Sequence, residues 1–291
     1  MPGFPFLLVD AFTDRPLAGN ACAVVLDADG LDDAAMLAIA RETNQAETAF
    51  VRRSATADFG VRFFTPAEEI PMAGHPTLAT AAALVDAGRV AAGRTELVLE
   101  MRVGPVRVEI TAGDPRRIVM TQPAPRFLAT HPAEVLSVFG LRADDALPGV
   151  PIQTVSTGTP MLMAPIRSLD ALRRARMDVA AYDRLRARSD FFSPHLFCLE
   201  GATPAGRTFA RQFGSPPDLP EDPFTGSATG AMGAYLWRHG LIDSPRFVAQ
   251  QGHWMGRPGE AEVEVLGPRD DVRGVRVGGG AVVVVRGELR I

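Results

Sequence analysis

The stretch EEIPMAGHPTLATAAALVDAG, residues 68–88, recurs in altered form as PEDPFTGSATGAMGAYLWRHG, residues 220–240. At a constant spacing of 152 residues the two stretches share more than the alanines that helices match by chance. The identical pairs are Glu69 and Glu221, Pro71 and Pro223, Gly74 and Gly226, and Thr77 and Thr229, followed by Ala79 and Ala231, Ala82 and Ala234, Leu84 and Leu236, and Gly88 and Gly240. Each copy follows a short Arg- and Phe-containing strand pattern, VRFFTP at 61–66 and ARQFGSP at 210–216. Two copies of one supersecondary unit indicate a pseudo-twofold protein with one unit in each half.

The rest of the pattern alternates between many short strands and a few helices. Helical patterns cover Asp32–Thr43, Pro76–Ala87, Pro132–Phe139, Leu169–Leu185 and Ala228–His239. Strand patterns cover Phe6–Phe12, Cys22–Asp27, Thr48–Arg52, Phe59–Phe64, Glu96–Glu100, Val106–Thr111, Arg117–Thr121, Gln153–Ser156, Pro160–Pro165, His195–Glu200, Thr208–Phe213, Arg246–Gln250, Glu260–Val265 and Ala281–Arg286. The two repeated helices are rich in Ala and Gly with almost no charge, which is typical of a helix buried on all sides. We therefore expect an α/β (α+β) fold in which each half is a curved, barrel-like sheet around one central helix.

Composition narrows the classes of function. With 291 residues the chain is long enough for two domains, and its hydrophobic and charged fractions of 46% and 22% are those of a globular protein. A net charge of −4 argues against a nucleic-acid binder, because little would neutralise the phosphates. No apolar run is long enough for a membrane span, and the N-terminal residues lack the basic segment of a signal peptide. Two distant cysteines give no disulfide framework, so we expect a cytoplasmic protein.

All of the basic residues other than histidine are arginines, because the sequence contains no lysine. This excludes a Schiff-base lysine and with it pyridoxal and class I aldolase chemistry, and it excludes a Walker-type phosphate loop. No GxGxxG follows a strand, and the histidines and cysteines show no metal-ligand spacing. The sequence thus predicts an enzyme or binding protein with no organic cofactor and no metal.

In both copies of the repeat a turn of small residues leads directly into the buried helix. Pro76 is expected at the first helical position of one helix, and Ser227 at the N-cap of the other. Two glycine-bracketed helix N-termini, at Gly74 and Gly226, can bind a carboxylate or an enolate-like oxyanion through their N–H groups and positive dipole ends. The alternative is that these glycines only allow close helix packing. If the pseudosymmetry is functional, Gly74 and Gly226 approach one another at a shared cleft.

Three ionisable residues, two of them in the repeat, are candidates for chemistry. His75 stands where the second copy has Ser227, although a lone histidine is more often a structural hydrogen bonder. Asp222 stands where the first copy has Ile70, so the acid occurs in one half only. Glu47 lies between the first helix and the next strand, where most glutamates are simply solvated.

Several of these motifs together resemble one protein family. NQAETAFV (44–51), AGHPTLATA (73–81), EDPFTGSATG (221–230) and VDAFTDRPLAGNACAVVLDADGL (9–31) are similar to the PhzF family of phenazine-biosynthesis isomerases, over essentially the whole chain. The resemblance implies the diaminopimelate-epimerase-like fold, with an N-terminal half at 1–122 completed by a strand at 281–291, a C-terminal half at 123–280, and the active site between them. Two departures are GNAC in place of the usual GNP, and Phe224 in place of the commoner small residue of EDPATGS. Phe224 affects the expected substrate more than the expected mechanism.

The resemblance also implies roles for individual residues. It assigns Glu47 as the general acid/base, His75 and Asp222 as its catalytic partners, and Gly74, Gly226 and Ser227 as substrate-binding groups. Epimerases and proline racemases of the same fold use two opposed thiols, and the corresponding positions here hold Ala73 and Thr225. A two-thiol racemase is therefore chemically excluded.

These observations predict a cofactor-independent isomerase that shifts a proton on a small carboxylate-bearing substrate, with Glu47 as the single base. The expected partners are that substrate and a second copy of the chain in a homodimer, with no nucleic acid and no membrane. Two alternatives stay open: a lyase or hydratase acting on a similar acid, and a non-catalytic carboxylate-binding protein. The presence of Glu47 argues against the second of these.

Overall fold

The computed structural model describes residues 3–113 and 116–291. Contacts between residues divide the chain into two units. The first consists of Met1–Thr121 together with Gly278–Ile291, and the second is Gln122–Val277. The C-terminal strand thus belongs to the unit that contains the N-terminus, and the chain passes between the units twice.

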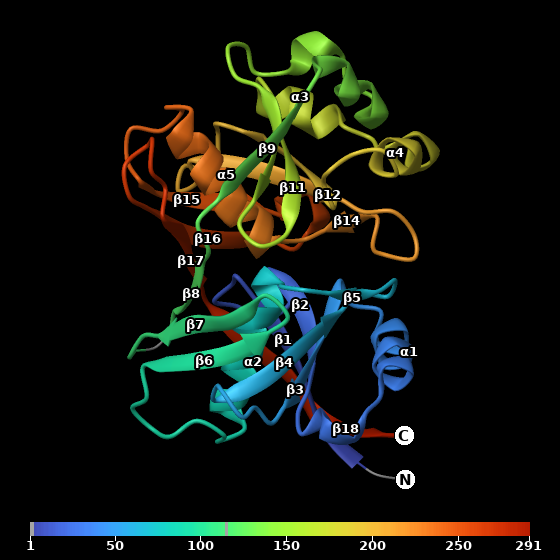
Figure 1. Cartoon of the computed structure of the whole chain (residues 1–291), viewed down its shortest axis with the longest axis vertical. Helices are drawn as coiled ribbons and strands as arrows, with labels where there is room; N and C mark the ends of the chain where they lie inside the picture. Colours follow the sequence, from blue (N-terminus) through green and yellow to red (C-terminus); the bar gives the residue numbers. More distant parts are fainter. Residues whose placement is uncertain (1–2, 114–115) are drawn as a thin grey trace. The chain divides into compact units, whose positions relative to one another are not determined.

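The first unit is a curved sheet that encloses one helix (Figure 1). Its strands pair in the order β18, β1, β2, β3, β4, β6, β7, β8, with β5 beside β4; β2 with β3 and β4 with β6 are parallel, and the other pairs are antiparallel. Along the chain its elements are β1 (Gly3–Ala11), β2 (Asn20–Val25), η1 (Ala28–Gly30), α1 (Asp33–Thr43), β3 (Glu47–Arg52), β4 (Phe59–Phe64), β5 (Glu69–Ile70), α2 (Gly74–Asp86), β6 (Glu96–Met101), β7 (Gly104–Ile110), β8 (Ile118–Gln122) and β18 (Ala281–Arg290).

The second unit repeats this plan with added helical segments. Its strands pair in the order β9, β10, β11, β12, β13, β15, β16, with β14 beside β13; β11 with β12 and β13 with β15 are parallel. Its elements are β9 (Arg126–His131), η2 (Ala133–Phe139), η3 (Ala143–Asp145), β10 (Ile152–Ser156), β11 (Pro160–Pro165), α3 (Leu169–Arg174), α4 (Val179–Arg186), β12 (Ser193–Cys198), β13 (Thr208–Phe213), β14 (Glu221–Asp222), α5 (Gly226–Arg238), β15 (Arg246–Gln251), η4 (His253–Met255), β16 (Gly259–Leu266) and β17 (Gly274–Gly279).

The repeat seen in the sequence is a repeat of topology. The run β1, β2, β3, β4, β5, α2, β6, β7 has its counterpart in β10, β11, β12, β13, β14, α5, β15, β16, and the parallel pairs fall at the same places. Both central helices have 13 residues, and both end before a glycine, Gly88 or Gly240, at φ 68°. A left-handed residue closes each helix with a C-terminal hydrogen-bond motif that glycine adopts without strain.

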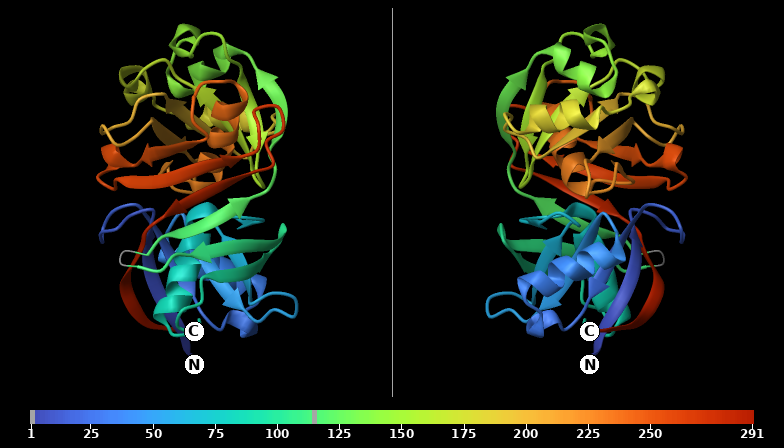
Figure 2. Two further views of the ribbon diagram at one scale, coloured as in Figure 1. Left: turned by 90° about the vertical axis from the view of Figure 1, so that its left-hand side faces the viewer. Right: turned by 90° about the vertical axis from the view of Figure 1, so that its right-hand side faces the viewer.

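The two central helices are buried as their composition predicts. Every residue of α5 from Gly226 to Leu236 is buried, and α2 is buried from Gly74 to Ala81. The left view in Figure 2 shows α2, in teal, with strands of its unit around it. Gly233 permits the packing of α5, because a Cβ there would lie 2.8 Å from Val263 of β16. The α/β fold with one central helix in each half is therefore confirmed.

Helices outside the sheets cover the opposite face. In the first unit α1 packs Met36 and Ile39 against Phe50 and Phe64 of the sheet. In the second unit η2, α3 and α4 pack a larger apolar cluster on the sheet, including Phe139, Leu172 and Phe213. Among the residues that the structure describes, no helix is both long and apolar enough to cross a membrane.

Three expectations about local structure were wrong. The segment expected as one helix over Leu169–Leu185 is divided into α3 and α4, and Pro132–Phe139 forms the 3-10 helix η2. Strands β5, β9, β14 and β17 were not expected. The division has a tertiary cause: the backbone N–H of Arg176 donates to the carbonyl of Phe139 at 2.9 Å, and the Asp178 side chain caps a new helix by accepting from Ala181 N at 2.9 Å.

Candidate active site

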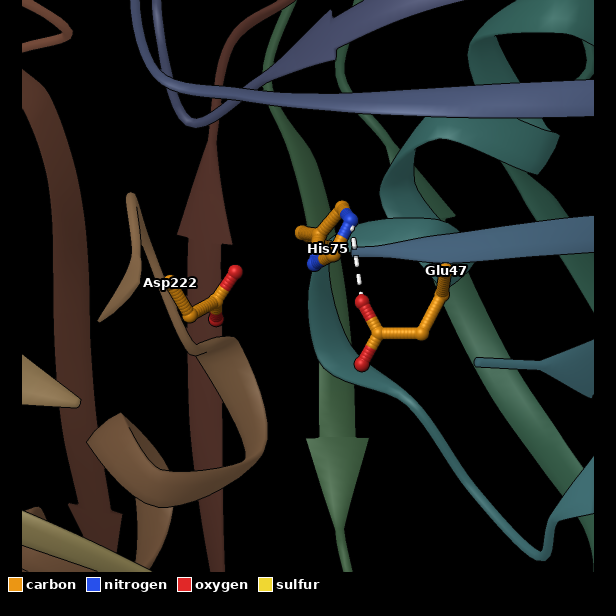
Figure 3. A group of neighbouring side chains, drawn as sticks. All are labelled: Glu47, His75 and Asp222. Atoms are coloured by element: carbon orange, nitrogen blue, oxygen red, sulfur yellow. Dashed lines mark ion pairs between the residues drawn. The ribbon is translucent and has the colours of Figure 1, made fainter. Parts of the chain in front are cut away.

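Glu47 and His75 come together at one edge of the first unit. Glu47 is the first residue of β3, and His75 is the second residue of α2. Oε2 of Glu47 lies 3.3 Å from Nε2 of His75. A dashed line marks this pair in Figure 3. The His75 side chain is 2% exposed and that of Glu47 is 17% exposed. The sequence-predicted base is thus held by a buried imidazole and keeps partial access to solvent.

Asn20, the first residue of β2, fixes the protonation of His75. The amide Nδ2 of Asn20 donates to Nδ1 of His75 over 2.9 Å, and both side chains are buried. An amide nitrogen is only a donor, so Nδ1 must be the unprotonated nitrogen and the ring proton sits on Nε2, facing Glu47. This tautomer places the N–H side of the His75 ring toward the Glu47 carboxylate, at an Nε2–Oε2 distance of 3.3 Å.

The loop before Asn20 has little conformational freedom. Gly19 is at φ 58°, and a Cβ there would lie 2.1 Å from the carbonyl oxygen of Ala11. Leu17 is also at positive φ, 63°, and its N–H donates to the buried carboxylate of Asp10 at 2.7 Å. A non-glycine residue in this region is strained. The contacts hold the backbone that places Asn20 beside His75.

The N-terminus of α2 begins earlier than expected. Ala73 is the N-cap, so Gly74 is the first helical residue and Pro76 is the third. Proline is tolerated there because the first four helical N–H groups have no partner within the helix. Ala73 has no side chain that could cap them. The positive end of the buried helix is thus available to an anion near Gly74 and His75.

The corresponding turn of the second unit carries Asp222. This residue ends β14, opposite Gln212 of β13. The hydroxyl of Thr225 donates to Oδ2 of Asp222. Gln251 ties the turn to β15, because its side-chain Nε2 donates to the carbonyl oxygen of Asp222 at 2.7 Å and its Oε1 accepts from Thr225 N at 3.2 Å. The carboxylate of Asp222 is thereby held at the entrance to α5.

The N-cap of α5 is Thr225, so the expectation that Ser227 fills this position was wrong. Thr225 makes no side-chain cap, since its hydroxyl is engaged by Asp222, and Gly226 and Ser227 are the first two helical residues. Side chains of the second unit hold the carbonyl of Gly226. Gln122 donates to the Gly226 carbonyl at 2.8 Å, and Thr157 donates to Gln122 Oε1 at 2.5 Å. The start of α5 is thus held by Gln122 and Thr157, and its N-cap residue makes no side-chain cap.

The two cysteines are unsuited to act as nucleophiles. Both are buried thiols outside any disulfide. Burial raises the pKa of Cys22 well above its usual value, and the negative charge of neighbouring Glu47 raises it further. Burial likewise raises the pKa of Cys198 to about 11. Since the thiolate is the reactive form, neither residue replaces the thiols missing at Ala73 and Thr225.

The structure brings Gly74, His75 and Glu47 together in the first unit, and Asp222, Gly226 and Ser227 together in the second. Figure 3 draws the three ionisable candidates. Sequence reasoning gave no role to Asn20, Gln122 or Gln251. Of these three residues, only Asn20 stands in a motif that the sequence analysis quoted, GNAC at 19–22. Phe224 is fully buried, packed so closely that a Cβ on Gly259 would lie 2.6 Å from its ring.

The fold has counterparts among solved structures. A hydroxyproline epimerase from Agrobacterium vitis matches 99% of this chain and 92% of its own, with a TM-score of 0.68 and 14% identity. The crystal structure of a PhzF-family phenazine biosynthesis protein from Bacillus anthracis matches the full length of both chains, with a TM-score of 0.88 and 31% identity. The protein thus has the fold of the PhzF-family phenazine biosynthesis protein, and the hydroxyproline epimerase shares that fold.

Sequence comparison identifies the family. A family model described as phenazine biosynthesis-like protein matches residues 9–287. The trans-2,3-dihydro-3-hydroxyanthranilate isomerase of Pseudomonas fluorescens is 34% identical over 290 residues, 98% of each chain. The uncharacterized isomerase YddE of Salmonella typhimurium is 35% identical over 295 residues, 97% of each chain. The chain belongs to the phenazine biosynthesis-like (PhzF) family and is an isomerase.

Proposed function

We propose that this isomerase needs no cofactor and moves a proton between two carbons of a small carboxylate-bearing substrate, with Glu47 as its single general acid and base. The observation that carries the proposal is the contact of 3.3 Å between Glu47 and a buried His75 whose other nitrogen accepts from Asn20. A carboxylate oriented by a neutral imidazole keeps an oxygen with which to accept a proton from carbon.

The proposed reaction has two proton-transfer steps. The Glu47 carboxylate removes a proton from a carbon made acidic by a carboxylate or imine, directly or through a double bond, and the C–H electron pair enters that conjugated system. The proton on Glu47 exchanges with solvent, to which the side chain is 17% exposed, and Glu47 then delivers a proton to a second carbon on the same face, where a new C–H bond forms. His75 holds Glu47 in both steps, and Asp222 orients a polar substituent of the substrate.

The two helix starts are proposed to hold the negative charge. Gly74 opens α2, and Gly226 and Ser227 open α5, and neither N-cap residue supplies a side-chain acceptor. Donors preorganised toward developing charge contribute strongly to catalysis. We propose that a helix start of this kind binds the substrate carboxylate or stabilises the enolate-like intermediate.

Deuterium exchange tests this function. The protein is incubated in D₂O with trans-2,3-dihydro-3-hydroxyanthranilate, the compound in the name of the Pseudomonas fluorescens relative, and then with related small carboxylates. The proposal requires an isomeric product that carries deuterium at carbon. Gain or loss of water in the product mass supports the lyase or hydratase instead. Binding without exchange for every compound supports a non-catalytic carboxylate-binding protein.

We also propose that the enzyme acts in the cytoplasm as a homodimer. Two buried thiols outside any disulfide suit a reducing compartment. Val285 of the C-terminal strand β18 is 46% exposed and Ile291, directly after the strand, is 42% exposed, and such apolar surface favours association. Sedimentation velocity on the purified protein tests the dimer, and a single monomeric species at micromolar concentration contradicts it.

A further inference from the structure

A bidentate ion pair joins β4 to β5 in the first unit. Arg62 donates from Nε to Oε1 of Glu69 and from Nη2 to Oε2, both at 2.8 Å. The guanidinium lies over the ring of Phe64, 5.1 Å from its centroid, and donates from Nη1 to Asp33 of α1 at 2.7 Å. The Arg62 and Glu69 side chains are only 20% and 16% exposed. Such a shielded, bidentate pair is stronger than an ordinary surface salt bridge.

The second unit contains the same arrangement. Arg211 donates from Nε to Oε1 of Glu221 at 2.8 Å and from Nη2 to Oε2 at 2.7 Å. Its guanidinium lies over Phe213, 4.6 Å from the ring centroid. The remaining Nη1 donates to the carbonyls of Leu172 and Ala175 at 3.2 and 2.9 Å, at the end of α3. The side chains of this pair are 10% and 19% exposed.

The two ion pairs have the same geometry although the turns that connect their strands differ in length. The turn between β4 and β5 spans residues 65–68, whereas that between β13 and β14 spans the longer segment 214–220. The register is nevertheless equivalent, with Phe64 opposite Glu69 and Phe213 opposite Glu221. Both units therefore keep the ion pair and the stacked Phe although the connecting chain differs.

The location of the pairs suggests their purpose. Strands β5 and β14 have only two residues each, so their backbone ladders hold them weakly. Each is followed at once by the turn into a central helix, which starts at Gly74 or Gly226. In the second unit Glu221 is anchored on one face of the sheet, and the next residue, Asp222, therefore points to the opposite face.

We infer that Arg62–Glu69 and Arg211–Glu221 are matched positioning pairs, each fixing the turn that carries the substrate-facing groups of its own unit. Arg62–Glu69 holds the segment that leads to Gly74 and His75. Arg211–Glu221 holds Asp222 and the start of α5. The catalytic consequence rests on the proposed function, whereas the mechanical consequence is independent of it.

Hydrogen exchange tests the mechanical part. In Glu69→Gln the amides of residues 69–77 exchange roughly tenfold faster, while residues 221–229 keep their wild-type rates, because a charge-assisted bond is weakened in one unit only. Glu221→Gln gives the reverse pattern. Arg94→Gln, which breaks the more exposed Arg94–Asp58 pair of the first unit, changes neither segment. Unchanged protection in both Glu variants, or acceleration spread evenly over a unit, overturns the inference.

Rescue and kinetics complete the test. Arg211→Lys keeps the charge but lacks the bidentate fork, and it loosens 221–229 less than Glu221→Gln does. The exchanged pair Arg211→Glu with Glu221→Arg recovers part of the protection that either single reversal loses. Deuterium exchange into trans-2,3-dihydro-3-hydroxyanthranilate then shows a lower kcat and a higher KM in the Gln variants, because the loosened turns carry groups proposed to bind the substrate, with unchanged values in Arg94→Gln. A wild-type enzyme inactive on every carboxylate refutes the proposed function but leaves the hydrogen-exchange result to decide the positioning role.

Discussion

Glu47→Gln separates the role of the carboxylate as a base from its role in the structure. Glutamine has the same shape and keeps a carbonyl oxygen that can accept from the Nε2–H of His75. The contact it replaces is 3.3 Å long, which is long for a charge-assisted hydrogen bond. We therefore expect the free energy of unfolding to fall by less than about 1 kcal/mol. The melting temperature should change by at most about 4 °C.

The effect on turnover is far larger, because an amide cannot take a proton from carbon near neutral pH. Loss of a general base lowers the rate by roughly 10²–10⁴. This corresponds to about 3–5 kcal/mol of additional barrier. The loss should fall in kcat, since the groups proposed to bind the substrate carboxylate are unchanged.

The assay is the rate of deuterium uptake into substrate carbon at saturating substrate, measured for Glu47→Gln, wild type and the control Glu42→Gln. Glu42 is exposed on α1, so the control makes the same chemical change away from the site. We expect the control to match wild type. If Glu47→Gln exchanges at close to the wild-type rate, Glu47 is not the base, and His75 or Asp222 takes that role.

The remaining predictions concern the supporting structure and the metal requirement. Gly19→Ala should lower both the melting temperature and kcat, because the new Cβ would meet the Ala11 carbonyl at 2.1 Å at φ 58°; unchanged activity would show that this loop does not place Asn20. Burial lowers the pKa of His195 to about 4. Between pH 6.5 and 4 this imidazole therefore binds a proton in the unfolded chain but not in the folded chain. The resulting stability is complete above pH 6.5 and falls by up to roughly 3 kcal/mol as the pH approaches 4, a loss that urea titrations of His195→Gln should not show. Turnover should persist after dialysis against a chelator. Glutamate and histidine side chains can both bind metals, so this experiment also tests whether Glu47 and His75 act through a metal ion. Activity that vanishes and returns with a divalent ion would contradict a metal-free mechanism.

The central part of the fold could be predicted because two chemical patterns repeat. Charge-free helices that are rich in Ala and Gly tolerate burial on every side, and Gly88 and Gly240 end them where a left-handed residue is required. The helix boundaries, Gly74–Asp86 and Gly226–Arg238, keep the spacing seen in the sequence. Local composition and tertiary packing agree in these segments, so the sequence is informative.

Prediction was wrong where tertiary contacts override local preference. The amphipathic stretch from residue 169 to residue 185 has no helix breaker, yet it is divided between α3 and α4. The carbonyls of Leu172 and Ala175 accept from the guanidinium of Arg211, a residue far along the chain. A contact of this kind leaves no local signal in the sequence, and so a continuous helix was the natural expectation.

The candidate site was likewise predicted only in part from the sequence. Glu47, His75 and Asp222 were found through motifs, but the function of Asn20 depends on two strands and a helix whose N-terminal ends meet, and the sequence alone does not bring these together. The N-cap of α5 was placed at Ser227 on side-chain preference, whereas Thr225 occupies it with its hydroxyl engaged by Asp222. A competing carboxylate three residues upstream decided the outcome.

Single-turnover exchange in D₂O with chelator-treated wild-type enzyme tests the central claim most directly. Mass spectrometry and proton NMR of the product from trans-2,3-dihydro-3-hydroxyanthranilate, or from the first related carboxylate that is turned over, give its mass and the labelled carbon. A cofactor-free isomerase with Glu47 as its base yields an isomer that has gained deuterium at one carbon, and Glu47→Gln yields almost none. A product that differs by the mass of water, or equal labelling by the wild type and Glu47→Gln, contradicts the account.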